Sequence, residues 1–271
     1  MTDEIFGLYS ELYEIACKED DTRLKTFADN QFYGRFLELP ADVVGYNRYF
    51  GWYKDAGSAE NFGEWLDLYH NEKEKRPVCL SEYGGGGAIS QHKDNVNWES
   101  DIDPVGVRHY ENYQSQLHEI LWKQFSVRKY LWAEFIWCMF DFASYGRTEG
   151  DTKSQNDKGL CTRERIPKDV YFFYKSVWSG EKTVYITERR HEFRACDEPF
   201  VKVYSNADAV ELCINDVSHG RISRCELPDD ESTVFVWENI KIKPGTKNKI
   251  CAKAYFSDGT SRTDYAFWTG K

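Results

Sequence analysis

Hydrophobic positions in the first 180 residues follow two alternating patterns. In the first pattern, apolar residues recur every three or four positions, as on one face of a helix. This spacing predicts helices over 3–20, 60–74 and 104–126, and a fourth helix that opens at Pro167 and ends near Trp178. The second pattern is a short, mostly apolar run, which predicts a buried strand. Such runs cover 22–28, 42–47, 77–82 and 130–140.

The alternation of strands and helices predicts a parallel sheet with crossover helices on both faces. In the first helix, the inward face is expected to carry Ile5, Leu8, Leu12, Ile15 and Ala16. Four strands with their helices amount to half of an eight-stranded β/α barrel. An open half-barrel would leave two unpaired sheet edges, which proteins avoid. Because no strand precedes the first helix, we favour the second half of a barrel over an unrelated open-sheet α/β fold.

After Gly180 the pattern changes to short strands separated by turn residues. The strands are predicted over 184–186, 201–204, 210–214, 233–236 and 250–255. The turns are predicted at Asn206, Asn215-Asp216, Pro228-Asp229-Asp230 and Pro244-Gly245. This spacing is typical of an all-β sandwich. The chain is therefore expected to comprise an α/β domain over 1–180 and an all-β domain over 181–271.

Charge and cysteine usage narrow the function classes. The net charge of −10 argues against nucleic acid as a partner, because phosphate binding requires basic patches. No apolar run reaches the ~18 residues of a membrane span, and no signal peptide is expected before the first helix. The eight cysteines lack CxxC pairs and zinc spacing. They are expected to be small buried hydrophobes in a reducing cytoplasm, with structural disulfides as the less favoured alternative.

Candidate chemistry centres on Glu82, which ends the apolar run 77–82 and precedes a glycine tract. In a β/α barrel, catalytic groups sit at the carboxyl ends of the strands. A carboxylate there could attack the anomeric carbon of a sugar, and the 16% aromatic content tilts mildly toward carbohydrate. The alternative is a surface glutamate that caps a turn.

Three other segments offer polar and aromatic groups at comparable positions. The loop after 42–47 supplies Asn47, Tyr49 and Trp52, and a phenol beside a carboxylate can hold it ionised. Trp137, near the end of the fourth strand, could form the floor of a sugar subsite. The next loop carries Asn156 and Lys158. Each segment has a structural alternative. The loop after 42–47 could be an aromatic cluster at the barrel mouth, Trp137 could pack in the core, and the loop with Asn156 and Lys158 could be a solvated turn.

In this order, the four segments resemble glycoside hydrolase family 2, the β-galactosidase and β-glucuronidase group. The resemblance spans nearly the whole chain, including 167–175. It continues through 203–207 and 210–212, which resemble the immunoglobulin-like domain that follows the barrel in many bacterial members. It implies the C-terminal half of a TIM barrel followed by an immunoglobulin-like β-sandwich.

The resemblance also implies residue roles. Glu82 matches the nucleophile at the end of the seventh barrel strand, and Tyr49 matches the tyrosine that hydrogen-bonds it. Trp137 matches a tryptophan that lines the substrate pocket. Asn47 is expected at the pocket wall, and Trp52 is expected to bind substrate as well. Asn156 and Lys158 match an Asn-x-Lys pair that contacts the substrate carboxylate in β-glucuronidases. Galactosidase-like members also carry Asn-Asp-Lys-Gly, so the pair leaves the sugar open.

The acid/base glutamate of the family follows an asparagine, and the first part of this chain has no Asn-Glu. Glu4 is a weak substitute, because a glutamate there more often serves the helix dipole. We therefore expect a retaining exo-β-glycosidase acting on β-galactosides, present here as a fragment with weak or no hydrolysis alone. The alternatives are a β-glucuronidase or a non-catalytic carbohydrate-binding remnant. No cofactor or metal is expected, although family members can bind magnesium or sodium. Whether this chain depends on the missing half of the barrel or forms a homo-oligomer stays open.

Overall fold

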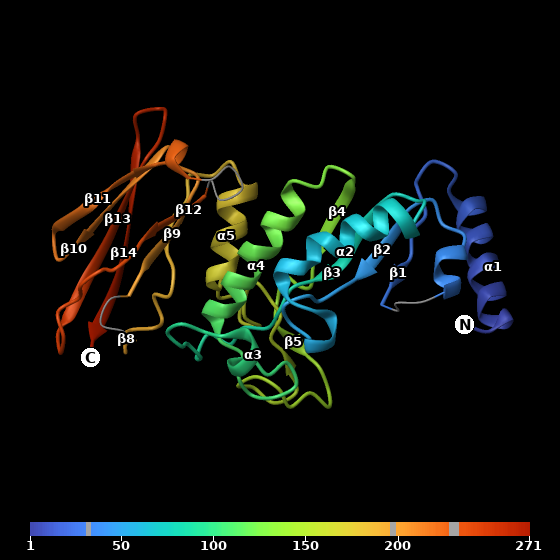
Figure 1. The fold of residues 1–271 in the computed structure, drawn as a ribbon, viewed down its shortest axis with the longest axis horizontal. Coiled ribbons are helices and arrows are strands. Elements are labelled where there is room, and N and C mark those ends of the chain that lie inside the picture. Colours follow the sequence, from blue (N-terminus) through green and yellow to red (C-terminus); the bar gives the residue numbers. More distant parts are fainter. Residues whose placement is uncertain (31–33, 196–198, 228–232) are drawn as a thin grey trace. The chain divides into compact units, whose positions relative to one another are not determined.

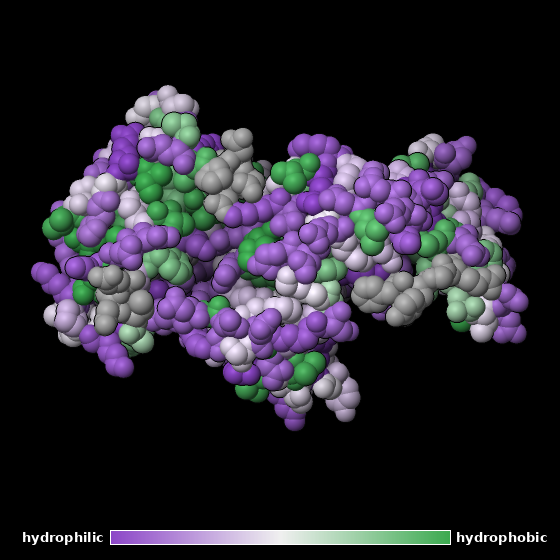
Figure 2. Space-filling view, viewed as in Figure 1, coloured by the Kyte–Doolittle hydropathy of each residue, from purple (hydrophilic) through white to green (hydrophobic). Residues whose placement is uncertain are grey.

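The computed structural model describes residues 1–30, 34–195, 199–227 and 233–271. These residues divide into two compact units. Figure 1 labels helices and strands of the chain. The first unit comprises residues 1–85 and 120–138, and the second comprises 86–119 and 139–271. The visible face of the protein is mainly hydrophilic, with hydrophobic side chains in separate patches (Figure 2).

The first unit is built on a four-stranded sheet in the order β1-β2-β3-β4. Its strands are β1 (Ala28–Asp29), β2 (Val44–Asn47), β3 (Val78–Tyr83) and β4 (Leu131–Ile136), and every neighbouring pair is parallel. The predicted parallel sheet is thus confirmed. The predicted strand 130–140 is too long, and it is not buried on both faces. β4 is an outer strand of the sheet and exposes Trp132 and Phe135.

The helices of the first unit differ in how they pack. Helix α2 (Phe62–Leu68) buries Phe62 and Leu66 completely and continues as a π-helical turn (Tyr69–Lys73). Helix α1 (Asp3–Glu19) buries no residue, and its predicted inward face is about half exposed at Leu8 and Leu12. Short 3-10 turns cover Gly34–Glu38, Lys54–Ala56 and Ala59–Asn61.

In the second unit, helices α3 (Trp98–Asp101) and α4 (Glu111–Ser126) replace the single helix predicted over 104–126. The last seven residues of α4 belong to the first unit. Pro104 and Gly106 occupy a turn in which the Gly106 N–H donates to the Asp103 carbonyl at 3.0 Å, so the helix starts later than predicted. Helix α5 (Asp169–Trp178) follows the paired strands β5 (Phe142–Ala143) and β6 (Gln155–Asn156).

The remaining strands form two sheets. The smaller sheet has the order β12-β9-β7, with β7 (Val184–Ile186), β9 (Val201–Ser205) and β12 (Val234–Trp237). The larger has the order β11-β10-β13-β14-β8. Its strands are β8 (Phe193–Arg194), β10 (Ala209–Ile214), β11 (Val217–Ser223), β13 (Lys247–Tyr255) and β14 (Ser261–Gly270). One buried cluster takes side chains from both sheets, including Val203, Leu212, Phe235, Ile250 and Trp268.

All five strands predicted after Gly180 are present, whereas β8, β11 and β14 were not predicted. β11 is largely exposed and polar, so it carries no apolar signal. It is joined to β10 by Asn215-Asp216, both with positive φ (50° and 65°), as in a tight hairpin turn. A 3-10 turn follows at Arg224–Glu226. The predicted turn at 228–230 lies outside the described residues.

Among the described residues, the cysteines are free thiols and no helix is long and apolar enough to cross a membrane. The expectation that the cysteines are buried holds for Cys79 and Cys161, whereas Cys138, Cys213 and Cys251 are only partly buried and Cys225 is exposed. Cys196 lies outside the described residues. The cytoplasmic location stays a prediction.

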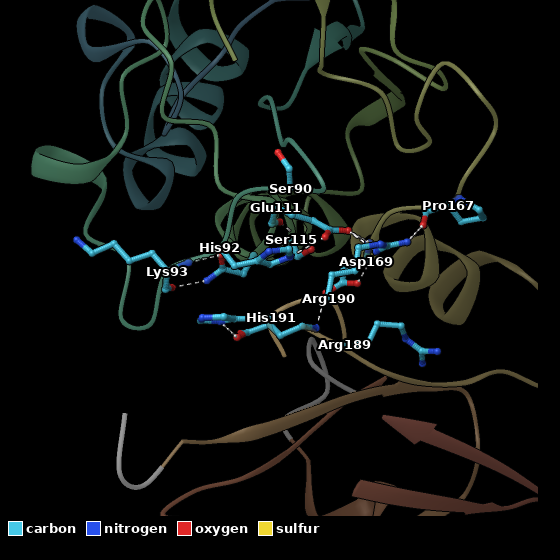
Figure 3. A network of polar contacts seen from close by, with 12 residues as sticks. Ser90, His92, Lys93, Glu111, Ser115, Pro167, Asp169, Arg189, Arg190 and His191 are labelled. Atoms are coloured by element: carbon cyan, nitrogen blue, oxygen red, sulfur yellow. Dashed lines mark hydrogen bonds and ion pairs between the residues drawn. The ribbon is translucent and has the colours of Figure 1, made fainter. Parts of the chain in front are cut away.

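A buried polar network links α4, α5 and the segment after β7 (Figure 3). The Glu111 carboxylate accepts hydrogen bonds from the Asp169 backbone N–H at 3.0 Å and from Arg190 Nη1 at 2.7 Å. His92 Nε2 lies 2.9 Å from the other Glu111 oxygen. The Asp169 carboxylate accepts from the Tyr185 hydroxyl at 2.6 Å. These bonds connect the part of the unit before residue 180 to the part after it.

Candidate active site

Glu82 lies near the carboxyl end of β3, beside the carboxyl end of the neighbouring β2. Asn47, the last residue of β2, is paired in register with Glu82. The next residue, Arg48, donates its backbone N–H to the Glu82 carbonyl at 2.9 Å. Because the two strands are parallel, the loop that follows β2 emerges at the same edge as Glu82.

The hydroxyl of Tyr49 donates a hydrogen bond to Glu82 Oε2 at 2.6 Å. Burial raises the pKa of Tyr49 well above its ordinary value, and the hydrogen bond to Glu82 raises it further. The phenol is therefore protonated and acts as the donor. A donor fixed on one oxygen holds the carboxylate in a defined orientation.

Asn47 is oriented by a side chain that precedes Glu82. Ser81 Oγ donates to Asn47 Oδ1 at 2.7 Å. The Asn47 NH₂ group has no acceptor among the described residues, and it belongs to a side chain that lines the cavity. Gly45 makes this approach of the strands possible, because a Cβ at position 45 would lie 2.7 Å from Ser81 Cβ. Ser81 thus orients the side-chain amide of Asn47, and Gly45 leaves the space that Ser81 needs.

These groups line a cavity of about 320 Å³. This volume lies in the range of small-molecule sites. Its lining side chains come from the ends of β1, β2 and β3 and from the loop after β2, and are Asn30, Asn47, Arg48, Tyr49, Tyr53, Asp55, Ala56 and Glu82.

Five lining residues of this cavity were not predicted from the sequence: Asn30, Arg48, Tyr53, Asp55 and Ala56. Tyr53 packs edge-on against Tyr49, with ring centroids 5.5 Å apart, and its place in the same loop was the available signal. Asp55 also lines the cavity. Arg48 is buried and pairs with buried Asp29, with Nη2 3.6 Å from Oδ2. That partner lies 19 residues upstream, so no local pattern reveals it.

The two predicted tryptophans lie outside the lining of this cavity. Trp52 is fully buried, so the structure places it behind the loop rather than on the cavity surface. Trp137 is partly buried and follows β4. Its backbone N–H donates to the carbonyl of Tyr83 at 3.0 Å, and the Trp137–Cys138 peptide bond is cis.

Asn156 and Lys158 belong to the second unit. Both are nearly fully buried, which does not fit the alternative of a solvated turn. Asn156 Oδ1 accepts the backbone N–H of Lys158 at 3.0 Å. Between them, Asp157 is held by His109 Nδ1 at 2.7 Å. The two candidate residues therefore sit in a loop shaped by its own side chains.

Two further groups hold this loop. Lys168 Nζ donates to Asp141 Oδ1 and to the Asp157 carbonyl, both at 2.8 Å. The same Asp141 oxygen accepts the Gly159 N–H at 2.8 Å, and a Cβ at Gly159 would lie 2.2 Å from the Asp141 backbone nitrogen. Burial raises the pKa of Asp141 to about 6, against the lowering effect of the Lys168 charge.

One group of metal-type ligands occurs among the described residues: Asp94, Glu188 and His191, whose ligand atoms lie within 4.8 Å of one another. Arg194 already occupies this cluster. Its Nη1 lies 2.7 Å from Glu188 and its Nη2 lies 3.0 Å from Asp94. A guanidinium that compensates both carboxylates removes the electrostatic demand for a cation, so we assign no metal there.

Comparisons with known proteins bear on the family and on the sugar. The family model "Glycosyl hydrolases family 2, TIM barrel domain" matches residues 7–183, and the model "Domain of unknown function (DUF4982)" matches residues 200–262. A β-glucuronidase of Bacteroides fragilis is 36% identical over 237 residues, which cover 87% of this chain and 32% of that protein. A putative β-glucuronidase of Formosa agariphila is 28% identical over 273 residues, covering 93% and 32%.

Two solved structures share the fold closely. An FMN-binding β-glucuronidase from Facaelibacterium prausnitzii L2-6 aligns with a TM-score of 0.86 and 32% identity, covering 100% of this chain and 39% of that one. A putative β-galactosidase from Bacteroides fragilis aligns with a TM-score of 0.88 and 28% identity, covering 98% and 38%. The chain thus spans about a third of the curated relatives that it matches. It contains part of a TIM barrel followed by a mostly β region, and it belongs to glycosyl hydrolase family 2.

Proposed function

We propose that this chain carries the nucleophile part of a retaining β-glucuronidase. The observation that supports this most is the 2.6 Å hydrogen bond from Tyr49 to Glu82 on the wall of a sugar-sized cavity. In such an enzyme, a Glu82 oxygen attacks the anomeric carbon while the bond to the leaving oxygen breaks. The Tyr49 phenol orients the attacking carboxylate, and the Asn47 amide is proposed to bind a sugar hydroxyl.

A retaining glycosidase also needs a general acid/base, whose carboxyl lies ~5–5.5 Å from the nucleophile. We assign none among the described residues. We therefore propose that hydrolysis requires a polypeptide that also contains the other strands of the barrel. For this chain, we propose only that Glu82 forms a covalent bond to the sugar.

A glucuronide is favoured over the β-galactoside expected from the sequence. The named β-glucuronidase relatives support it, and so does Lys158, because an ammonium group pairs with a uronate carboxylate. We propose that Asn156 and Lys158 recognise this carboxylate. The relative named a putative β-galactosidase keeps a galactoside as the second candidate. We also propose that the β region is an immunoglobulin-like sandwich, with two sheets around one buried cluster.

The test uses a sugar that needs no acid catalyst. In 2-deoxy-2-fluoro-β-D-glucuronosyl fluoride the leaving group is fluoride, and the 2-fluorine slows hydrolysis of the glycosyl-enzyme. Attack by Glu82 forms one C–O bond and releases one fluoride ion. Intact mass spectrometry should show a single 2-fluoroglucuronosyl adduct, and peptide mapping should place it on Glu82.

Two variants and one competing sugar sharpen the result. Glu82→Gln should take no label, and exposed Glu60→Gln should label normally. The matching 2-fluorogalactosyl fluoride should label Glu82 more slowly than the glucuronosyl reagent does. Lys158→Ala should reduce the ratio of these two labelling rates. Faster labelling by the galactosyl reagent would favour the second candidate, and labelling elsewhere than Glu82 would refute the nucleophile assignment.

A further inference from the structure

A second and larger cavity, of about 700 Å³, lies within the second unit. Its walls are the exposed side of α4, the loop 94–97, the segment 199–202, and β12 with the residues that follow it. None of its lining residues belongs to the Glu82 cavity. We propose that this groove binds a neutral saccharide, the size of one or two sugar rings, as a non-catalytic site.

The groove offers polar side chains that are free to meet a ligand. Asn95, Gln116, Glu238 and Asn239 line it, and within the described part of the chain their side chains make no hydrogen bond or ion pair. Amides donate and accept, and carboxylates accept. This set matches sugar hydroxyls, each of which is both a donor and an acceptor.

The charged groups of the groove argue against an anionic ligand. Its two cations are Arg194 and Lys202. Arg194 is committed to Asp94 and Glu188, and Lys202 Nζ lies 2.8 and 2.7 Å from the two oxygens of Glu119. Among the described lining residues, a phosphate or a uronate would find no uncommitted cation, and it would face the carboxylate of Glu238.

The apolar part of the groove comes from the alternation of β12 and from Phe200. Successive residues of β12 alternate between two environments. Val234 and Val236 line the groove, whereas Phe235 and Trp237 belong to the buried cluster of the two sheets. Phe200 is partly exposed at the other side. Apolar side chains opposite a polar wall suit a sugar ring, whose C–H face packs on aromatic and aliphatic carbon.

The remaining polar lining is held rigid by its own contacts. Asn112 donates to the Lys93 carbonyl at 2.8 Å, and Asn97 caps α3 through the backbone N–H of Glu99 at 2.9 Å. A site whose side chains are already ordered loses less conformational entropy when a ligand binds. The groove thus combines a fixed frame with four exposed polar side chains that bond to none of the described residues.

The experiment titrates the full 271-residue chain with cellobiose, lactose and maltose, followed by ligand-observed saturation-transfer NMR. We expect at least one of them to bind, with a dissociation constant on the order of 1 mM. The double variant Gln116→Ala/Asn239→Ala should weaken that binding about tenfold or more, and so should Phe200→Leu. Exposed Asn71→Ala is the matched control and should bind as the parent does. Thermal unfolding of each variant verifies that the fold is kept.

Three results would overturn the proposal. The first is that none of the three disaccharides binds to the folded chain. The second is binding that survives the groove variants but is lost in Asn47→Ala, which would assign it to the Glu82 cavity. The third is competition by glucuronate or inorganic phosphate at the groove, because Arg194 and Lys202 are already paired with carboxylates of the chain. Failure of Glu82 labelling would leave these outcomes unaffected, so the two proposals can fail separately.

Discussion

At the scale of single residues, function depends on contacts that tune otherwise ordinary side chains. Glu82 is one of many carboxylates in an acidic chain, and its partner Tyr49 distinguishes it. Asn47 is oriented by Ser81, which itself needs glycine at position 45. His118, by contrast, is fully buried against the Tyr174 hydroxyl at 2.9 Å and serves stability.

Tyr49→Phe should slow covalent labelling of Glu82 about 10- to 100-fold, because a hydrogen bond to a charged group contributes roughly 1.5–3 kcal/mol. The rate of adduct formation by mass spectrometry measures this. Tyr145→Phe removes a fully exposed phenol and should leave the rate unchanged. Equal rates in both variants would mean that Tyr49 does not prepare the carboxylate for attack.

His118 should make the fold sensitive to acid. Burial lowers its pKa to about 3, and the Lys168 charge adds to this, whereas an unfolded histidine titrates near 6.5. Above pH 6.5 both states are neutral and the stability is complete. Below it only the unfolded state gains a proton, so the free energy of unfolding falls by up to ~1.4 kcal/mol per pH unit.

Urea unfolding at several pH values tests the role of His118. His118→Gln should flatten the loss of stability between pH 6.5 and 5, relative to the parent chain. His219→Gln changes an exposed histidine and should keep the parent's slope. An unchanged slope in the His118 variant would assign the acid sensitivity to other groups.

At the scale of elements, the same apolar periodicity led to two different outcomes. Helix α4 buries Leu117 and Leu121 completely. Helix α1 has an equally regular stripe, yet Leu8 and Leu12 remain more than half exposed at 54% and 52%. A periodic pattern identifies a helix and its apolar face, but it does not say what covers that face.

Matched leucine truncations should separate the two helices. Leu117→Ala should lower the free energy of unfolding by about 2–5 kcal/mol, because it opens a cavity in a packed core. Leu12→Ala should change it by less than about 0.5 kcal/mol. The helix propensity changes equally in both, so the difference reports burial.

Denaturant unfolding at two protein concentrations provides the measurement. A large loss in Leu12→Ala that depends on concentration would mean that another chain covers the α1 face. A large loss independent of concentration would contradict the exposure of this face.

At the scale of the whole molecule, a buried ionic network connects the part of the second unit before residue 180 to the part after it (Figure 3). Glu111 is fully buried and binds Arg190, the Asp169 backbone and His92. Burial raises the pKa of Asp169, and the nearby Glu111 charge raises it further. Such networks are costly to break, because the remaining charge loses its partner in a medium of low polarity.

Glu111→Gln should therefore lower the free energy of unfolding by about 3–5 kcal/mol, because Arg190 is left without its closest carboxylate. Glu99→Gln, an exposed change on α3, should have an effect within about 0.5 kcal/mol. Urea unfolding followed by tryptophan fluorescence compares the two. Equal stabilities would show that the network does not stabilise the unit.

Several features could be predicted from local sequence. The apolar run before Glu82 predicted β3, and the Asn215-Asp216 pair predicted a turn that became a hairpin. β14 and β11 escaped prediction because their polar, exposed positions interrupt the apolar signal. The start of α4 was placed too early because Val105 and Val107 continue the helical spacing, although Pro104 and Gly106 favour a turn.

The sequence by itself determined the parallel α/β part, the following β region, and the short list of polar residues at strand ends. These follow from hydrophobic periodicity, which is local along the chain. The family resemblance implied that Tyr49 reaches Glu82, but only the tertiary structure shows this contact, places Trp52 behind the cavity and pairs Arg48 with Asp29. Those contacts join residues 19 to 33 positions apart or depend on packing on all sides, so no pattern of neighbouring residues encodes them.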